Sequence, residues 1–188
     1  YVIPTNSNTA NKIKAVENPV SFTSSGQSYA FSVYSASNKK IKATLVWTDK
    51  EPALASLSQQ SVSKLVNDLD LVVTDPSGNI FNGNDFTAPF NDQFDRLNNV
   101  EQVRIDNTQE GAYTFTINAF NIPSSLDPQN FAVIVSYSSP IPSITIQGTP
   151  NIGNTITFNL EDKNRENANY LFALSDGNSV GIPLSDGR

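Results

Sequence analysis

Apolar residues alternate with small or polar residues along most of this chain, and this period of two constrains the fold more than any other feature. Each alternating segment is bounded by turn-forming residues, and six such segments are found, at 29–33, 41–47, 69–73, 103–105, 113–119 and 131–137. A period of two places successive side chains on opposite faces of an extended strand, so each segment predicts a half-buried β-strand. The run Asp75-Pro76-Ser77-Gly78 has the proline and glycine of a tight turn. The pattern predicts an all-β fold, an antiparallel β-sandwich or jelly roll.

Composition divides the chain into three parts. Residues 1–16 show little alternation and predict a connector from an upstream domain, whereas residues 17–139 contain the six strand segments. Two prolines follow in Ser138-Ser139-Pro140-Ile141-Pro142, which is typical of a short stiff linker. Alternation resumes afterwards, at 144–146, 156–160 and 170–174. We expect residues 140–188 to be this linker and the start of a second small, sandwich-like β domain, because they are too few for a complete sandwich.

The chain contains no histidine, cysteine or methionine. Their absence excludes Ser/His/Asp and Cys/His nucleophile systems, thiolate or imidazole metal sites and disulfide bonds. We therefore expect no catalytic residues in this chain. No apolar run approaches the roughly 20 residues of a membrane-spanning helix. The sequence opens on Tyr1 without a signal pattern, so we expect it to be a piece cut from a longer protein.

The net charge of -6 is concentrated in one window. Residues 67–101 hold a single base, Arg96, and seven acidic side chains: Asp68, Asp70, Asp75, Asp85, Asp92, Asp95 and Glu101. Outside this acidic window the remaining 11 acidic and 11 basic side chains balance. They form no basic stripe of the kind that nucleic acids require. The charge distribution therefore argues against a nucleic-acid partner and favours a cation.

Two carboxylates in the acidic window fall on one face of a predicted strand. In the run 67–71, Asp68 and Asp70 share a face and lie roughly 7 Å apart, while the intervening Leu69 faces the core. Like charges at this distance repel each other, and a bound cation would offset that cost. Calcium prefers carboxylate and amide oxygens, which the window supplies in abundance. The spacing matches neither an EF-hand nor a nonapeptide repeat.

Other interpretations of these residues remain open. Acidic, asparagine-rich loops also serve solubility alone. Paired carboxylates about 5 to 9 Å apart can act as acid and base in glycoside hydrolysis, given an aromatic-lined cleft. The aromatic residues available for such a lining also fit simple packing under a loop: Phe81, Phe86, Phe90 and Phe94. Trp47 could stack on a sugar, but its alternation with Leu45 favours the core.

Seven blocks of the sequence resemble, in order and spacing, a known jelly-roll domain. They are Leu-Val-Trp-Thr-Asp at 45–49, Leu-Val-Asn-Asp-Leu-Asp-Leu at 65–71, Asp-Pro-Ser-Gly at 75–78, Gly-Asn-Asp-Phe at 83–86, Asn-Asn-Val-Glu at 98–101, Gly-Ala-Tyr-Thr at 111–114 and Pro-Gln-Asn-Phe-Ala at 128–132. The domain follows the catalytic domain in secreted bacterial subtilisin-like alkaline serine proteases, and it is similar to the P-domain of proprotein convertases. The resemblance covers roughly residues 17–138. It implies a jelly roll that packs against an upstream catalytic domain, with the catalytic triad outside this chain and calcium stabilising both domains.

The acidic window and the matched blocks together predict a non-catalytic, calcium-stabilised accessory domain of a secreted subtilisin-like serine endopeptidase. Its partner would be the upstream catalytic domain, and its location extracellular. The candidate calcium ligands are Asp49, Asp68, Asp70, Asp85, Asn99 and Glu101, with Asp92 and Asp95 in reserve.

Two further functions stay open. Jelly rolls host many lectin-like sites, so the chain could be a carbohydrate- or substrate-binding module that uses Phe86 or Phe90 to hold a protein or polysaccharide. The β segments after Pro140 also allow a surface adhesion or assembly module. Independently of function, the lack of methionine and cysteine predicts tolerance to oxidation.

Overall fold

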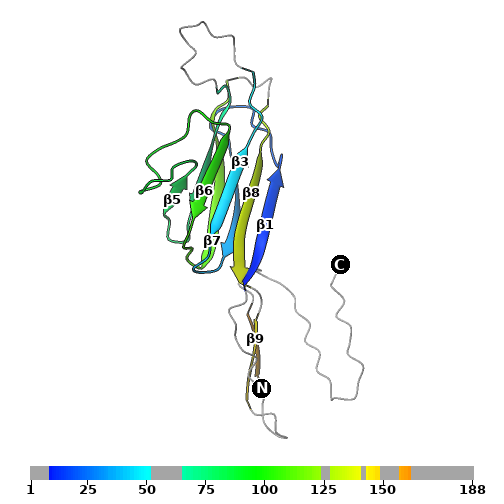
Figure 1. The fold of residues 1–188 in the computed structure, drawn as a ribbon. Helices are drawn as coiled ribbons and strands as arrows, with labels where there is room; N and C mark the ends of the chain where they lie inside the picture. Colours follow the sequence, from blue (N-terminus) through cyan, green and yellow to red (C-terminus); the bar gives the residue numbers. More distant parts are fainter. Residues whose placement is uncertain (1–8, 52–64, 124–127, 141–142, 149–156, 162–188) are drawn as a thin grey trace.

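The computed structural model describes residues 9–51, 65–123, 128–140, 143–148 and 157–161, which form two facing antiparallel sheets and one separate hairpin (Figure 1). The first sheet has the strand order β1 (Thr9–Glu17), β8 (Ala132–Pro140), β3 (Ile41–Val46) and β6 (Val100–Ile105). The second has the order β2 (Ser28–Ser35), β7 (Gly111–Asn121), β4 (Asp68–Thr74) and β5 (Ile80–Asn82). The hairpin consists of β9 (Ser143–Gln147) and β10 (Thr157–Glu161).

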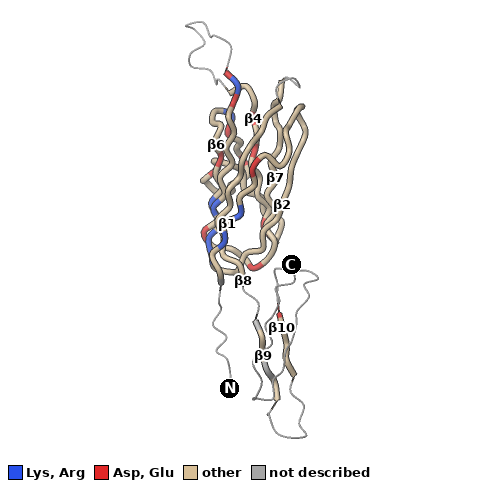
Figure 2. Tube along the Cα trace, turned by 90° about the vertical axis from the view of Figure 1, so that its right-hand side faces the viewer, with Lys and Arg blue, Asp and Glu red and all other residues tan. Residues whose placement is uncertain are grey.

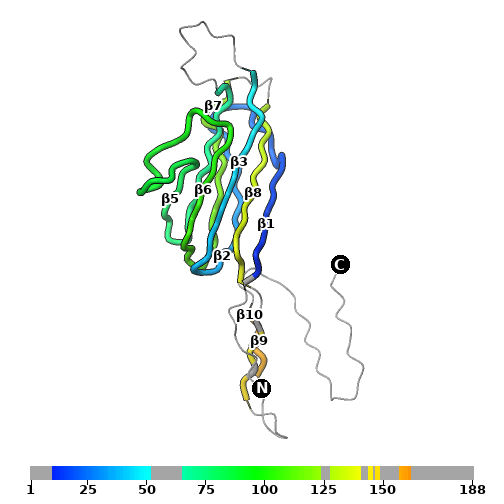
Figure 3. The backbone as a smooth tube through the Cα atoms, in the orientation of Figure 1, coloured from blue at the N-terminus to red at the C-terminus, as the bar shows by residue number. Residues whose placement is uncertain are grey.

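The strand order is that of a jelly roll. β1 pairs with β8, β2 with β7, β3 with β6 and β4 with β5, all antiparallel. The chain therefore follows the path of one long hairpin wrapped across two sheets, which Figure 3 lets the reader trace. The predicted all-β sandwich is confirmed, and the six alternating segments before residue 140 are β2, β3, β4, β6, β7 and β8.

Two strands of the sandwich, β1 and β5, are not predicted by the alternation of apolar and polar residues. β1 includes residues 9–16, which fall in the predicted connector. Lys14 lies opposite the buried Val135 on the inner side of this edge strand; its Nζ donates to Ser32 O at 3.2 Å and lies 4.9 Å from the Phe31 ring centroid. An inward-pointing charge protects an edge strand from pairing with another chain, and it also interrupts the apolar pattern. Figure 2 shows basic positions grouped around β1. β5 is too short to show a period, at three residues.

β8 extends through the serines that predicted a linker. Ser138 O accepts a hydrogen bond from Ala36 N at 2.8 Å, and Ser138 Oγ donates to Asn11 Oδ1 at 2.8 Å. The strand ends at Pro140. Beyond it, β9 covers the alternation at 144–146 and β10 covers most of 156–160, while the segment 170–174 lies outside the described residues. The three-part division of the chain stays a prediction.

The core fills the space between the two sheets. Its fully enclosed side chains, each 0% exposed, are Ile41, Leu45, Leu69, Leu71, Val73, Phe115, Ile117 and Val135. Phe31 and Phe115 stack with ring centroids 5.2 Å apart, and Phe22 and Phe131 stack at 5.1 Å. Trp47 is 2% exposed within this cluster. Its burial confirms the core interpretation of the tryptophan.

The register of β1 and β8 fixes where the chain enters and leaves the sandwich. Thr9 lies opposite Pro140 at one end, and Glu17 lies opposite Ala132 at the other, where β3 contributes Val46 (Figure 1). We call these the proximal and distal ends. Both flanking segments of the chain join the sandwich at the proximal end, and a pocket described below lies at the distal end.

Candidate functional site

Asp68 and Asp70 lie on the face of β4 that turns away from the core, as the alternation predicted. Both side chains are nevertheless buried, at 9% and 7% exposed. Arg96, from the loop between β5 and β6, contacts the two of them. Its Nη1 lies 3.3 Å from Asp68 Oδ1 and donates to Asp70 Oδ1, and its Nη2 donates to Asp70 Oδ2 at 3.3 Å. The sequence predicts a bound cation between these two carboxylates. In the structure, the guanidinium of Arg96 from the same chain lies there.

Aromatic rings hold Arg96 in place. Its guanidinium carbon lies 3.6 Å from the ring centroid of Phe120 on β7 and 5.1 Å from that of Phe94 in the same loop as Arg96. A guanidinium over an aromatic face is attracted by the negative face of the ring. Arg96 is not among the site residues that the sequence predicts. The available signal was its position as the single base among seven acids.

One guanidinium does not fully compensate two buried carboxylates. Burial raises the pKa of Asp68 to about 6, with Arg96 acting in the opposite direction and Asp70 adding to the rise. Burial also raises the pKa of Asp70, again against the effect of Arg96. The cluster formed by Asp68, Asp70 and Arg96 thus keeps an excess of negative charge when both carboxyls are ionised.

Glu101 lies on the inner face of β6 and joins the two sheets. It is 1% exposed, and its Oε2 accepts a hydrogen bond from Leu71 N on β4 at 2.6 Å. The contact is made next to Gly83, directly after the end of β5, and a Cβ on Gly83 would overlap the Glu101 carboxyl group. Burial raises the pKa of Glu101 to about 8. The close approach of glycine and carboxyl explains why a side chain is absent at position 83.

Two buried oxygens near this contact lack a hydrogen-bond donor among the described residues. They are Glu101 Oε1 and Asn82 Oδ1, and the amide nitrogen of Asn82 donates to Gln93 O at 3.0 Å. An unpaired buried acceptor costs about 1 to 3 kcal/mol. Carboxylate and amide oxygens are the ligands that calcium prefers. Among the predicted ligands, Glu101 is the one whose free buried oxygen fits an oxygen-binding cation.

Asp49 and Asn99 instead bind the main chain. Asp49 Oδ1 accepts from Lys50 N at 2.9 Å and from Asn67 N at 2.7 Å, and Oδ2 accepts from Val66 N at 2.7 Å. Asn99 Nδ2 donates to Trp47 O at 2.8 Å. Both carboxylate oxygens of Asp49 are therefore committed to main-chain donors.

Asp85, Asp92 and Asp95 order the loop between β5 and β6. Asp85 Oδ2 accepts from Asp92 N at 3.2 Å and from Gln93 N at 3.4 Å. Asp95 accepts from Leu97 N at 2.8 Å through Oδ1 and from Asn84 Nδ2 at 2.6 Å through Oδ2. These carboxylates support the backbone that presents Arg96.

The predicted ligands thus belong to separate hydrogen-bond networks. Arg96 occupies the Asp68–Asp70 pair, which for that reason does not fit a metal ion. Within the part of the chain that the structure describes, no three histidine, cysteine, aspartate or glutamate side chains form a group that could hold a metal. Calcium binding by Asp49, Asp68, Asp70, Asp85, Asn99 and Glu101 stays a prediction.

The aromatic side chains of the acidic window pack against defined partners. Phe81 and Phe90 have ring centroids 5.9 Å apart, and the Arg104 guanidinium carbon lies 5.4 Å from the ring centroid of Phe86. Phe94 contacts Arg96, as described above. With Arg96 between the two carboxylates, this arrangement favours packing over the acid/base alternative.

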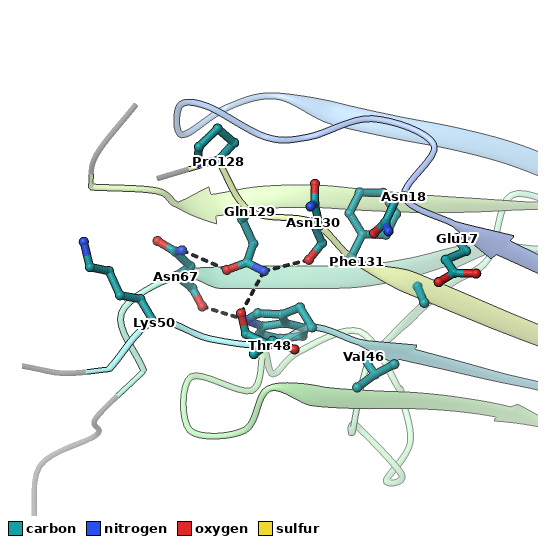
Figure 4. A pocket seen from close by; sticks show the side chains of 12 residues that line it. Glu17, Asn18, Val46, Thr48, Lys50, Asn67, Pro128, Gln129, Asn130 and Phe131 are labelled. Carbon is teal, nitrogen blue, oxygen red and sulfur yellow. Dashed lines mark hydrogen bonds between the residues drawn. The ribbon is translucent and has the colours of Figure 1, made fainter. Parts of the chain in front are cut away.

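A second candidate site is a pocket of about 720 Å³ at the distal end of the sandwich (Figure 4). Carboxamide side chains line it, namely Asn18, Asn67, Gln129 and Asn130. Asn67 and Gln129 are each 4% exposed. Asn67 Nδ2 donates to Gln129 Oε1 at 2.8 Å, and Gln129 Nε2 donates to Thr48 O at 3.1 Å and to Asn130 O at 2.6 Å. The buried amides form a connected network beneath the pocket.

Apolar and charged groups complete the pocket lining. Val46, Trp47 and Phe131 contribute apolar surface, and Trp47 Nε1 donates to Asn67 O at 2.9 Å. Figure 4 shows the side chains of Lys50 and Glu17 at opposite ends. The sequence does not predict this pocket, because its lining comes from four segments that are distant along the chain.

Comparison with known proteins identifies a sequence relative of this chain. No family model matches the chain. Over 126 residues it is 37% identical to the "Serine protease/ABC transporter B family protein tagA" of Dictyostelium discoideum, a match that covers 64% of this chain and 7% of that protein. The chain is similar to a small segment of a much larger protein. It thus has a distant link to a protein that contains a serine protease.

Two solved structures share low similarity with the chain. A protein of Sulfurospirillum deleyianum gives a TM-score of 0.34 at 7% identity, covering 65% of this chain and 96% of that one. The periplasmic inhibitor of g-type lysozyme from Aeromonas hydrophila gives a TM-score of 0.28 at 8% identity, covering 73% and 91%. Among the described residues, no helix has the length and apolar character needed to cross a membrane.

Proposed function

We propose that this chain is a non-catalytic accessory β-domain of a larger, secreted protease of the subtilisin-like class. The observation that carries the proposal is the 37% identity over 126 residues to a segment of a protein named as a serine protease. The seven sequence blocks that resemble the domain following a subtilisin-like catalytic domain support the same assignment. With no histidine in the chain, the catalytic residues would belong to another part of the protein.

The jelly roll is suited to such a position in a longer chain. Thr9 and Pro140 lie opposite each other at the proximal end, so both flanking segments join the domain on one side. Neighbouring chain ends are typical of domains that are appended to or inserted into other domains. The proposed catalytic partner would therefore be connected at the proximal end.

The first test removes the domain from the whole protein. We expect deletion of residues 9–140 to shorten the half-life of peptidase activity on heating and to leave kcat/KM for a small peptide substrate within about threefold. A matched deletion in another non-catalytic segment serves as the control. A complete protein without peptidase activity, or with an unchanged half-life after the deletion, would contradict the accessory role.

Calcium stabilisation forms the second part of the proposal. Its support is the pair of buried oxygens, on Asn82 and Glu101, that lack a hydrogen-bond donor among the described residues. An amide oxygen and a carboxylate oxygen are hard ligands of the kind that calcium prefers. A cation that binds only the folded state adds about 2.7 kcal/mol of stability at 100 times its dissociation constant.

Thermal unfolding of the chain tests the calcium proposal directly. We expect Tm to rise by several degrees in millimolar calcium relative to EDTA, with magnesium much less effective. Glu101→Gln should abolish most of that rise, whereas Asp106→Asn, at an exposed carboxylate paired with Lys40, should retain it. Identical melting curves in calcium and EDTA would remove calcium from the proposal and leave the accessory role untouched.

A further inference from the structure

We propose that the distal pocket binds a neutral oligosaccharide. The accessory role proposed above makes no use of this pocket, and the inference depends neither on that role nor on calcium. The pocket lies at the Glu17, Val46 and Ala132 end of the sandwich, opposite the end where the flanking segments join. The pocket therefore lies at the end away from the proposed catalytic partner.

The floor of the pocket is fixed before any ligand arrives. Asn67 and Gln129 are each 4% exposed and hydrogen-bond to each other, and Gln129 is tied further to the carbonyls of Thr48 and Asn130. Buried, mutually bonded amides keep one geometry, so binding costs little ordering of the site. The hydrogen-bond network therefore gives the pocket a floor of fixed shape.

The polar lining matches hydroxyl groups. Asn18 and Asn130 are exposed residues of the pocket lining, and Thr48 contributes a hydroxyl; Asn130 Oδ1 also accepts a hydrogen bond from Ser21 Oγ. A carboxamide donates and accepts hydrogen bonds side by side, and a sugar hydroxyl has the same two capacities. Carboxamides therefore satisfy hydroxyl groups without requiring charge on the ligand.

The charges at the pocket argue against an ionic ligand. Among the described residues, Lys50 and Glu17 are the charged ones that line it, and Figure 4 shows them at opposite ends. A phosphate or carboxylate site would instead gather charges of one sign. The uncharged middle of the pocket combines carboxamides with the apolar surface of Val46, which is 43% exposed.

The apolar surface and the size of the pocket suit the C–H faces of sugar rings. Small-ligand sites are mostly apolar with a few placed polar groups, and they occupy about 300 to 1,000 Å³. The pocket, at about 720 Å³, falls within this range. The site differs in place from the Phe86 and Phe90 loop that the sequence suggested for a binding module.

Trp47 provides a local probe of occupancy, because it is the single tryptophan of the chain and lines the pocket. The experiment titrates the 188-residue chain with cellotriose, chitotriose and maltotriose, following tryptophan fluorescence and calorimetric heat. A neutral tetrapeptide is titrated in parallel. We expect a saturable change with at least one trisaccharide at millimolar concentration or below, and none with the peptide.

A double variant locates the binding. Asn18→Gly with Asn130→Ala removes two carboxamides together with the exposed Ser21–Asn130 hydrogen bond, and leaves the buried Asn67–Gln129 network intact. Glycine suits position 18, where Asn18 already has φ of 45°. We expect affinity to fall at least about tenfold, since two hydrogen bonds to the ligand are lost, while the loss of the exposed Ser21–Asn130 hydrogen bond lowers Tm by no more than a few degrees. Asn107→Ala, beyond the proximal end of β6, is the matched control and should bind like the parent.

Three outcomes would overturn the inference. Absence of saturable binding by both methods would show that the pocket is not a sugar site. If the peptide bound saturably and none of the trisaccharides did, the ligand would be a peptide and not an oligosaccharide. Equal trisaccharide affinity in the double variant and the parent would place the binding elsewhere.

Discussion

Arg96 is the counter-ion of two buried aspartates. The spacing of Asp68 and Asp70 predicts that the two carboxylates repel each other, and the sequence offers calcium as the compensating charge. The structure supplies a guanidinium from within the chain. The loop that presents it has no periodicity, and its position relative to β4 depends on contacts that are distant in sequence. For that reason the pattern of residues could predict the need for a cation but not its identity.

Replacing Arg96 should show how far the stability of the fold depends on a counter-ion for Asp68 and Asp70. We expect Arg96→Gln to lower the free energy of unfolding by about 2 kcal/mol at pH 7, because two buried carboxylates lose their partner while one-third of the arginine side chain is already exposed. The loss should shrink near pH 4, where the raised pKa of about 6 keeps Asp68 protonated in the folded state. Urea unfolding of the parent and the variant at pH 7 and pH 4 measures the loss of unfolding free energy.

The control for this variant is Arg104→Gln, which removes an exposed arginine from β6. We expect a change below about 0.5 kcal/mol, as for most surface substitutions. Equal losses for the two variants would mean that Arg96 contributes no more than a surface charge.

Glu101 should make the metal-free chain less stable as pH rises. Its pKa rises from 4.5 in the unfolded chain to about 8 in the folded state, so the folded state binds the proton more tightly. This contribution is fully present below pH 4.5 and is lost as pH rises through about 8. In EDTA, Tm of the parent should therefore fall between pH 6 and pH 8.

Glu101→Gln tests this assignment, since glutamine keeps an oxygen for Leu71 N and carries no charge. The variant should show a nearly flat Tm from pH 6 to pH 8, and its stability at pH 8 should equal or exceed that of the parent. Asp106→Asn should keep the slope of the parent. A parent Tm that rises over this interval would contradict the proposed buried, protonated state.

At the scale of elements, alternation located the strands that have one buried face and missed those that do not. β2, β3, β4, β6, β7 and β8 follow the rule that apolar side chains repeat every second residue. β1 breaks it with Lys14, whose aliphatic stem and ammonium cross to β2. Ser138 and Ser139 extend β8 because pairing with β1 satisfies their backbone. Neither effect has a local signature in sequence.

Gly83, directly after β5, packs against Glu101 on β6, so a side chain at position 83 should destabilise the fold. We expect Gly83→Ala to cost about 3 kcal/mol, because the new Cβ would overlap the Glu101 carboxyl group and its main-chain contact to β4. Gly78→Ala is the comparison: position 78 has φ of 87° and open space around it, so only backbone strain of about 1 kcal/mol applies. Guanidinium unfolding gives both values, and a smaller loss at 83 than at 78 would refute the close approach.

At the scale of the whole molecule, the sandwich could be predicted from the sequence, but the residues that come together at each site could not. The jelly-roll class follows from strand number and from a family resemblance. The distal pocket draws on four segments that converge only through the strand order. The predicted calcium ligands are likewise spread over separate networks, because proximity in sequence does not determine where loop side chains point.

The intact chain should resist oxidation. It contains no methionine or cysteine, so peroxide finds none of the side chains that it oxidises most readily. We expect overnight exposure to millimolar peroxide to leave the melting curve unchanged within about 1 °C of Tm. A surface variant with one added methionine, such as Asn107→Met, should show the sulfoxide by mass spectrometry under the same conditions. A large loss of stability in the parent would contradict the expectation.

The antiparallel register of β1 and β8 also determines how the domain would respond to tension. Thr9 and Pro140 face each other, and both flanking segments leave from that pair. A pull on the two segments would load the hydrogen bonds of this ladder one at a time, starting at the pair and moving toward Glu17 and Ala132. Such unzipping needs less force than shearing a whole strand at once. The sandwich would therefore yield mechanically at its first and last strands, whatever its thermal stability.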